Sequence, residues 1–199
     1  AVGMRIDGNT VRMQNWFSDY DAHGVAIYDR SWGTSITNNT IDSPSRYGIY
    51  CTYNTKLNHV FGGSIADADT ASAYAPFPYT RITDNTLFGS KDSTLAAKRS
   101  SGIVMVNGVA GDGNASGIHI TGNRIEGFTT SIEFLTNSHT TGSAQPGFED
   151  MIIANNICRS TPFATQTAGY NIDWTSGSGN AGILKKANIS NNIFSVRGI

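Results

Sequence analysis

Short segments in which apolar and polar residues alternate recur along the whole chain. In six places an aliphatic residue is followed by two small or polar residues, an asparagine and further apolar residues. The six asparagines are Asn9, Asn39, Asn85, Asn123, Asn156 and Asn192, at intervals of 30, 46, 38, 33 and 36 residues. A second alternating segment follows each of them, as in 48–52 and 102–106. Alternation with a period of two predicts strands, and its repetition with variable spacers predicts stacked coils joined by loops of different length.

Equivalent residues of successive coils should form columns, because parallel strands pair with one another about 4.8 Å apart. We expect two inward-facing apolar columns, since β-branched residues suit a solenoid core. The first is Ile6, Ile36, Ile82, Ile120, Ile153 and Ile189, and the second is Val25, Ile49, Ile103, Ile132, Ile172 and Ile199.

The recurring asparagine is expected at a bend between strands, in a structural role. There it would adopt left-handed backbone and bond to nearby backbone or to the asparagine of the next coil. Cys51 and Cys158 fall at inward positions three coils apart, or roughly 14 Å. This separation is too long for a disulfide, so both should behave as small core hydrophobes.

The pattern resembles the PbH1-type repeats of right-handed parallel β-helix proteins. This is the pectate-lyase-like superfamily, which includes polysaccharide lyases, glycoside hydrolases, epimerases and bacteriophage tailspikes. The resemblance covers nearly the whole chain and implies an all-β fold: a right-handed parallel β-helix, or solenoid, of about six coils in a single domain over residues 1–199. No capping element is visible, so we expect a fragment of a longer chain that is truncated at both ends.

Composition narrows the classes of partner. The chain has 14 basic and 15 acidic residues, a near-neutral balance that argues against a nucleic-acid partner. No apolar run approaches the roughly 18 residues that a membrane helix needs, and no export signal is visible. We therefore expect neither nucleic-acid binding nor membrane insertion.

One predicted outward column holds two carboxylates. The column is Ala26, Tyr50, Val104, Glu133 and Asp173, so Glu133 and Asp173 would lie on adjacent coils. Two carboxylates at such a spacing can divide the work of acid and base, or acid and nucleophile, as in glycoside hydrolases. The alternative is that both are solvated strand residues paired with cations such as Arg124 or Lys185.

A second candidate lies in the segment 19–24, which contains Asp21 and His23. An imidazole beside a carboxylate suits general acid–base chemistry near neutral pH. The triplet Asp21-Ala22-His23 is faintly similar to the Asp-Pro-His element of mannuronan epimerases, with Ala in place of Pro. The alternative is a solvated turn.

Aromatic residues in loops and on outward columns are candidates for sugar binding, because a flat apolar ring with a polar edge suits a sugar. The predicted substrate-binding residues are Trp16, Tyr20, Tyr28, Tyr50 and Arg124. The alternative is that loop aromatics fold back over the coil edges. Trp174 is excluded because its register points inward. The segment 112–123 lacks the final Glu of a calcium-binding EF-hand, so we expect no metal and no cofactor.

Three functions follow from the resemblance. The first is a carbohydrate-active protein similar to a phage tailspike depolymerase, which binds and hydrolyses a polysaccharide or cell-surface glycan. The second is a non-catalytic glycan-binding adhesin or receptor-binding shaft. The third is an alginate- or pectin-type lyase or C5-epimerase that uses Asp21 and His23, with Arg30 or Arg46 to neutralise a uronate. The resemblance also implies a homotrimer and an extracellular or virion location.

Overall fold

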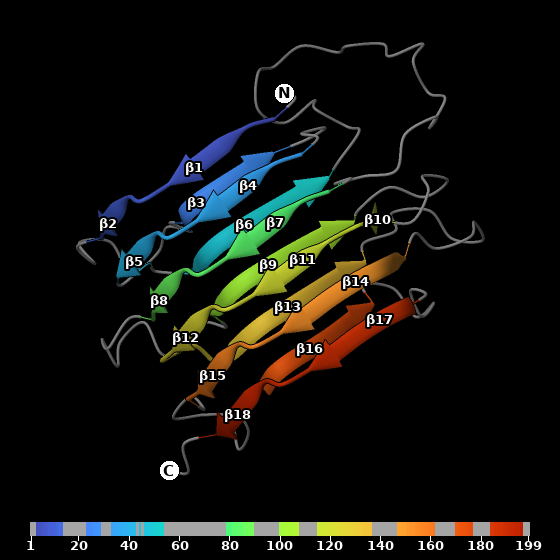
Figure 1. Ribbon diagram of the computed structural model, residues 1–199. Coiled ribbons are helices and arrows are strands. Elements are labelled where there is room, and N and C mark those ends of the chain that lie inside the picture. Colours follow the sequence, from blue (N-terminus) through green and yellow to red (C-terminus); the bar gives the residue numbers. More distant parts are fainter. Residues whose placement is uncertain are drawn as a thin grey trace.

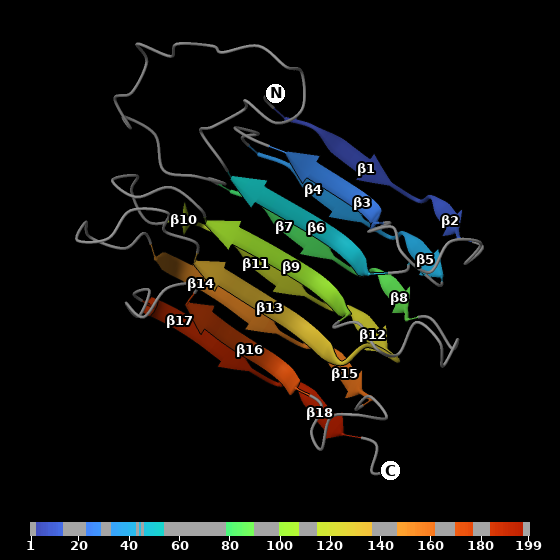
Figure 2. The ribbon, with the colours of Figure 1, turned by 180° about the vertical axis from the view of Figure 1, so that it is seen from behind.

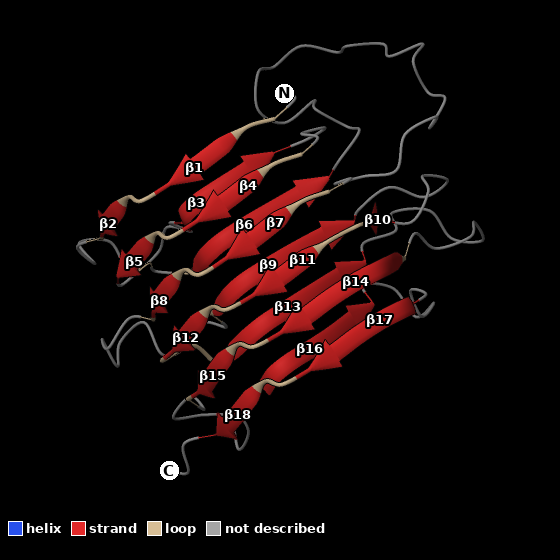
Figure 3. Ribbon diagram, viewed as in Figure 1, coloured by secondary structure: helices blue, strands red, loops and turns tan. Residues whose placement is uncertain are grey.

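A computed structural model of the chain describes residues 3–13, 23–28, 33–42, 44, 46–53, 79–89, 100–107, 115–136, 147–161, 170–176 and 184–196. These residues form strands and turns, and none of them is helical. Every strand pairing among them is parallel, and the strands build three stacked sheets (Figure 1, Figure 3). In the described residues, no helix is long and apolar enough to span a membrane.

Each sheet collects strands that recur along the chain. The first sheet contains β1 (Arg5–Asp7), β4 (Ser35–Thr37), β7 (Arg81–Thr83), β11 (His119–Thr121), β14 (Phe148–Ala154) and β17 (Leu184–Ser190), and the short β10 (Ala115–Ser116) pairs with β14. The second contains β2 (Thr10–Arg12), β5 (Thr40–Asp42), β8 (Thr86–Phe88), β12 (Arg124–Glu126), β15 (Ile157–Ser160) and β18 (Ile193–Val196). The third contains β3 (His23–Tyr28), β6 (Tyr47–Tyr53), β9 (Ser101–Asn107), β13 (Thr130–Thr136) and β16 (Tyr170–Ser176).

The chain visits the three sheets in turn and then returns to the first, beside the strand it left. Strands β1 and β2 lie at one end of the stack and β17 and β18 at the other, as both views show (Figure 1, Figure 2). This arrangement confirms the all-β, parallel architecture and is compatible with a β-helix solenoid. The number of coils, their hand and the state of the two ends stay predictions.

The predicted inward columns are in register. Ile6, Ile36, Ile82, Ile120, Ile153 and Ile189 pair in sequence across the first sheet. Val25, Ile49, Ile103, Ile132 and Ile172 do so across the third, while Ile199 lies outside the described residues. A further column that the sequence reading did not name comprises Val11, Ile41, Leu87, Ile125, Cys158 and Phe194 in the second sheet. The central members of all three columns are buried and form one core.

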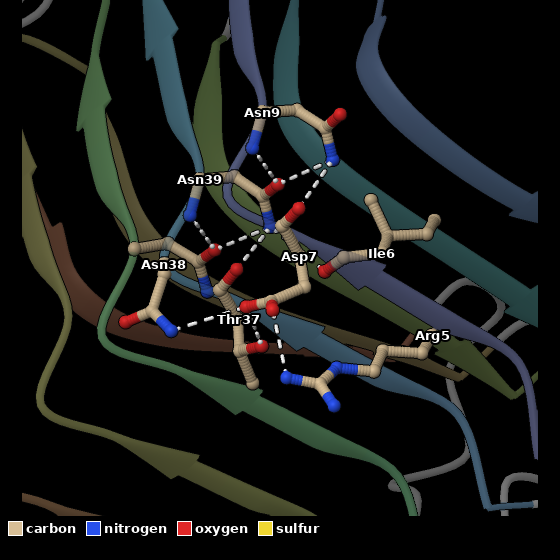
Figure 4. A network of polar contacts seen from close by, with 8 residues as sticks. Arg5, Ile6, Asp7, Asn9, Thr37, Asn38 and Asn39 are labelled. Atoms are coloured by element: carbon tan, nitrogen blue, oxygen red, sulfur yellow. Dashed lines mark hydrogen bonds and ion pairs between the residues drawn. The ribbon is translucent and has the colours of Figure 1, made fainter.

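The recurring asparagines form a ladder along the bend between the first and second sheets. Asn39 illustrates it: its backbone N–H and its side-chain Nδ2 both donate to Oδ1 of Asn85, at 3.0 and 2.9 Å. The same pair of bonds joins Asn9 to Asn39, which Figure 4 shows. The structural role predicted for these residues is confirmed, because each amide satisfies backbone groups that the bend leaves outside the strand pairing.

The left-handed backbone, however, belongs to the residue before each ladder asparagine, so this prediction was wrong by one position. The left-handed residues are Gly8, Asn38, Asp84, Gly122, Asn155 and Asn191, with φ between +54° and +70°. The reason is geometric, since the ladder asparagine must direct both its N–H and its amide along the stack toward the next Oδ1. The preceding residue therefore makes the reversal.

Cys51 and Cys158 are free thiols in the core. They lie on different sheets, β6 and β15, and at most 1% of either is exposed. Burial raises the pKa of each thiol to about 12. The sequence-based prediction that they are unbonded core residues is confirmed.

Candidate functional site

The outer face of the third sheet carries the two predicted carboxylates. Val104, Glu133 and Asp173 pair in register across β9, β13 and β16, and Tyr50 and Ala26 continue this column on β6 and β3. The register expected from the sequence is therefore present. Adjacent members of the column have backbones about 4.8 Å apart.

A second outward column runs parallel to the first, three residues earlier along each strand. It comprises His23, Tyr47, Ser101 and Thr130, which pair in register. Direct contacts show that both columns lie on one face: Ser101 bonds to Glu133, and Tyr47 stacks on Tyr50. The chemistry of this face therefore comes from both columns together.

In β3, β6 and β9 the spacing of three arises at a glycine, and in β13 Ser131 takes this position. Gly48 and Ile49 both face the interior, because a Cβ built on Gly48 would lie 3.4 Å from Leu87 and from Phe128, and Ile49 is a core residue. The same Cβ would lie 2.6 Å from the carbonyl oxygen of Gly102, which is too close for any side chain. Glycine thus allows two successive inward positions, which simple alternation does not predict.

Glu133 is buried rather than solvent-facing. Only 2% of it is exposed, and the hydroxyl of Ser101 donates to its Oε2. Its neighbour Val104 is fully buried and Asp173 is partly buried. A buried carboxyl is uncommon and needs hydrogen-bond partners, so this one distinguishes the site from an ordinary solvated strand face.

Aromatic rings and a guanidinium adjoin the carboxyl. The imidazole of His23 stacks on Tyr47 and Tyr50, with ring centroids 5.1 and 4.8 Å apart, and the two tyrosine rings lie 5.2 Å apart. The guanidinium carbon of Arg46 lies 4.8 Å from the Tyr47 centroid. The backbone carbonyl of Arg46 accepts a hydrogen bond from the N–H of Ser101. The backbone of Arg46 is therefore bonded to β9, the strand whose Ser101 side chain bonds to Glu133.

The pKa of Tyr47 reflects its proximity to these groups. Burial raises the pKa of its phenol most strongly, Arg46 opposes that rise, and the Glu133 carboxylate adds to it. A phenol, a cation and a carboxyl therefore lie close together on the outer side of the third sheet, where Tyr47 and Glu133 are themselves buried. Next to them the hydroxyl of Thr130 is buried and has no hydrogen-bond partner among the described residues.

The remaining predicted site residues are distributed as follows. Arg124 lies on β12 in the second sheet, where its Nε is 2.7 Å from Oε1 of Glu126 and its guanidinium carbon 6.0 Å from the Phe88 centroid. It is therefore not brought to the third-sheet site, and it does not pair with Glu133. Lys185 lies on β17 in the first sheet, in register with Glu149.

Several other candidates are only partly described. Tyr28 ends β3 and pairs through its backbone with Thr52, and nothing is described of its side chain. Trp174 packs against the core and stacks on Phe134 with centroids 5.1 Å apart, as its exclusion from the site requires. The predictions made for Trp16, Tyr20, Asp21 and Arg30 fall outside the described residues.

Sequence reasoning missed three members of the site: Tyr47, Ser101 and Thr130. The signal that could have found Tyr47 and Ser101 is the glycine that follows this column in His23-Gly24, Tyr47-Gly48 and Ser101-Gly102, whereas Thr130 is followed by Ser131. Within the described residues, no group of three or more His, Cys, Asp or Glu residues could hold a metal ion.

Comparison with known proteins finds no protein-family model, no curated protein and no solved structure that matches the chain.

Proposed function

We propose that this protein is a right-handed parallel β-helix of the pectate-lyase-like kind, which binds a polysaccharide across the outer face of the third sheet and hydrolyses it. The observation that carries the proposal is the buried carboxyl of Glu133, held by Ser101 and in register with Asp173. Glycoside hydrolysis requires two carboxyl groups in different surroundings, one as the acid and one as the base or nucleophile.

The roles follow from exposure. Glu133, shielded from water, donates a proton to the glycosidic oxygen as the bond between that oxygen and the anomeric carbon breaks. Asp173, which is more exposed, takes a proton from the attacking water or attacks the anomeric carbon itself. Ser101 is a positioning residue, because it acts through the carboxyl that it holds.

The test is cleavage of pectin, alginate and a bacterial capsular polysaccharide by the full chain, followed by reducing ends and ultraviolet absorbance. Glu133→Gln and Asp173→Asn should each lower the rate at least a hundredfold, the typical contribution of an acid or base, with circular dichroism unchanged. Glu126→Gln is the matched control, because this carboxylate lies on β12 in the second sheet. Rates untouched by either substitution would refute the assignment.

A second function is supported by one observation, the 2% exposure of Glu133, which limits contact between its carboxyl and a bound chain. A non-catalytic glycan-binding shaft needs no such contact. It would bind a polysaccharide of the panel and release neither reducing ends nor unsaturated products.

The lyase or epimerase alternative uses His23 and Arg46, which lie at this face, and a lyase would give ultraviolet-absorbing products.

A further inference from the structure

A second line of left-handed residues runs along the first sheet, before β1, β4, β7 and β11 and within β14 and β17. The residues Gly3, Gly33, Tyr79, Gly117, Asp150 and Lys186 have φ between +50° and +72°. Each stands two residues before one of the positions that pair across this sheet, namely Arg5, Ser35, Arg81, His119, Ile152 and Asn188. The six therefore form a column of their own, with neighbours about 4.8 Å apart.

Two members of this column do not suit its backbone. Glycine adopts positive φ without cost and occupies three of the positions, and Asp150 belongs to a type that tolerates it, whereas Tyr79 and Lys186 do not favour it. Tyr79 is the most unfavourable, since a bulky residue at φ +59° is a genuine outlier. Neither backbone preference nor a buried contact accounts for it, because 75% of Tyr79 is exposed. Strained residues that persist without a packing reason cluster at functional sites.

Tyr79 lies beside Gly117, its neighbour in this column. A Cβ on Gly117 would lie 3.2 Å from the backbone nitrogen of Tyr79 and 3.6 Å from its ring carbon Cδ1. The Tyr79 ring therefore lies near Gly117, where a side chain would crowd the backbone of Tyr79, while most of Tyr79 faces solvent.

Beyond Gly117 the column continues with two charged residues, Asp150 and Lys186. Oδ2 of Asp150 lies 3.4 Å from the Ser116 hydroxyl, and Oδ1 of Asp150 lies 3.5 Å from Nζ of Lys186. The side chains of Asp150 and Lys186 are 49% and 75% exposed. An ion pair this exposed contributes little to stability, so it does not explain why Lys186 occupies a position that favours glycine.

We propose that Tyr79, Ser116, Asp150 and Lys186 form a polysaccharide-binding subsite along the first sheet, in which one sugar ring stacks on Tyr79 and hydroxyls of the next sugars of the same chain bond to Asp150 and Lys186. An exposed aromatic ring beside a donor and an acceptor is the arrangement that recognises a sugar, which has one apolar face and a hydroxyl-rich edge. The choice of a polysaccharide as ligand rests on the proposed function. The subsite itself lies on a different sheet from Glu133.

The test is native affinity electrophoresis in gels that contain pectin, alginate or a bacterial capsular polysaccharide, together with thermal melting. Every variant is also made in the Glu133→Gln background, so that cleavage does not consume the ligand. Tyr79→Gly should weaken binding about three- to tenfold through loss of the stacked ring. It should also raise the melting temperature by about 2–4 °C, because the strain is relieved. Tyr79→Phe should keep the binding, and Phe88→Ala on β8 in the second sheet is the aromatic control.

Tyr79→Gly should weaken binding and raise the melting temperature, whereas the loss of a purely structural residue would lower the melting temperature. Unchanged affinity in Tyr79→Gly, a lower melting temperature in this variant, or no retardation of the wild type by any of the three gels would each overturn the subsite. Loss of cleavage in Glu133→Gln with unchanged binding in Tyr79→Gly would overturn the subsite alone. Binding that depends on Tyr79 in a protein that cleaves none of the panel would support the subsite and overturn the hydrolase.

Discussion

Replacement of a central ladder asparagine tests how much of the stability rests on side chains at the bend. The amide of Asn85 is 1% exposed. Its Nδ2 donates to the carbonyls of Ile36 and Thr83 and to Oδ1 of Asn123, at 2.9, 3.0 and 3.0 Å. Its Oδ1 accepts from the backbone N–H and the Nδ2 of Asn39, at 3.0 and 2.9 Å.

The magnitude follows from which groups lose a partner in Asn85→Ala. The buried N–H of Asn39 loses its acceptor, which costs about 2 kcal/mol, and the other lost bonds add about 1 kcal/mol. The Nδ2 of Asn39 keeps its bonds to Ile6 and Thr37, and Oδ1 of Asn123 keeps the N–H of residue 85. We therefore expect the free energy of unfolding to fall by about 3 kcal/mol.

The matched control is Asn9→Ala at the end of the ladder. Asn9 is exposed, its Nδ2 donates to Asp7 and Asn39, and Oδ1 of Asn39 keeps the N–H of residue 9 after the substitution. No buried group is orphaned, so the expected cost is only about 0.5 kcal/mol. Urea denaturation followed by circular dichroism gives both losses of unfolding free energy, and hydrogen exchange reports the protection of the backbone N–H of Asn39 directly. An equal loss of unfolding free energy in the two variants, or a backbone N–H of Asn39 that stays protected in Asn85→Ala, would refute the reasoning.

Two further predictions concern buried groups of the core. The hydroxyls of Thr34 and Thr80 are buried and have no hydrogen-bond partner among the described residues, so Thr34→Val and Thr80→Val should each raise the free energy of unfolding by about 1 kcal/mol in urea titrations. The thiols of Cys51 and Cys158 have a pKa raised from 9.0 to about 12. Because the folded pKa lies above the unfolded one, their contribution to stability is full below pH 9 and is lost as the pH rises from 9 to 12. Cys51→Val should flatten the fall in melting temperature over this range, and wild-type thiols that react with a thiol reagent at pH 8 in the folded state would contradict the burial.

The columns of the fold could be predicted from sequence because each depends on one residue type at one repeated position. Ile36, Ile82 and Ile120 occupy the same position in successive repeats, and this position is apolar because its neighbours in the core offer no hydrogen-bond partner for a polar side chain. The same holds for the ladder, where the asparagine amide meets identical neighbours above and below. The position of the left-handed residue was not predictable in this way. In Asn38-Asn39 and Asp84-Asn85 either residue tolerates positive φ, and only the direction of the bonds along the stack decides between them.

The chemistry of the outer face was predicted in part. The register of Glu133 with Asp173 follows from counting along the repeats, whereas the burial of Glu133 depends on Ser101 and its surroundings in three dimensions. Tyr47 and Ser101 share the face with Glu133 only because two successive residues turn inward at Gly48 and Gly102. Strict alternation places them on the opposite side, so pattern reasoning alone could not bring them to the site.

The two columns of left-handed residues differ in the residue types that they contain. The column before the ladder uses Gly, Asn and Asp throughout, the residue types that adopt positive φ most readily, so its sequence follows the needs of the backbone. The second column, along the first sheet, has the same kind of backbone, yet it holds Tyr79 and Lys186 with their side chains in solvent. The preference of the backbone therefore does not account for Tyr79. In the proposed subsite the Tyr79 ring contacts a sugar, so Tyr79→Gly should increase stability and weaken binding at once.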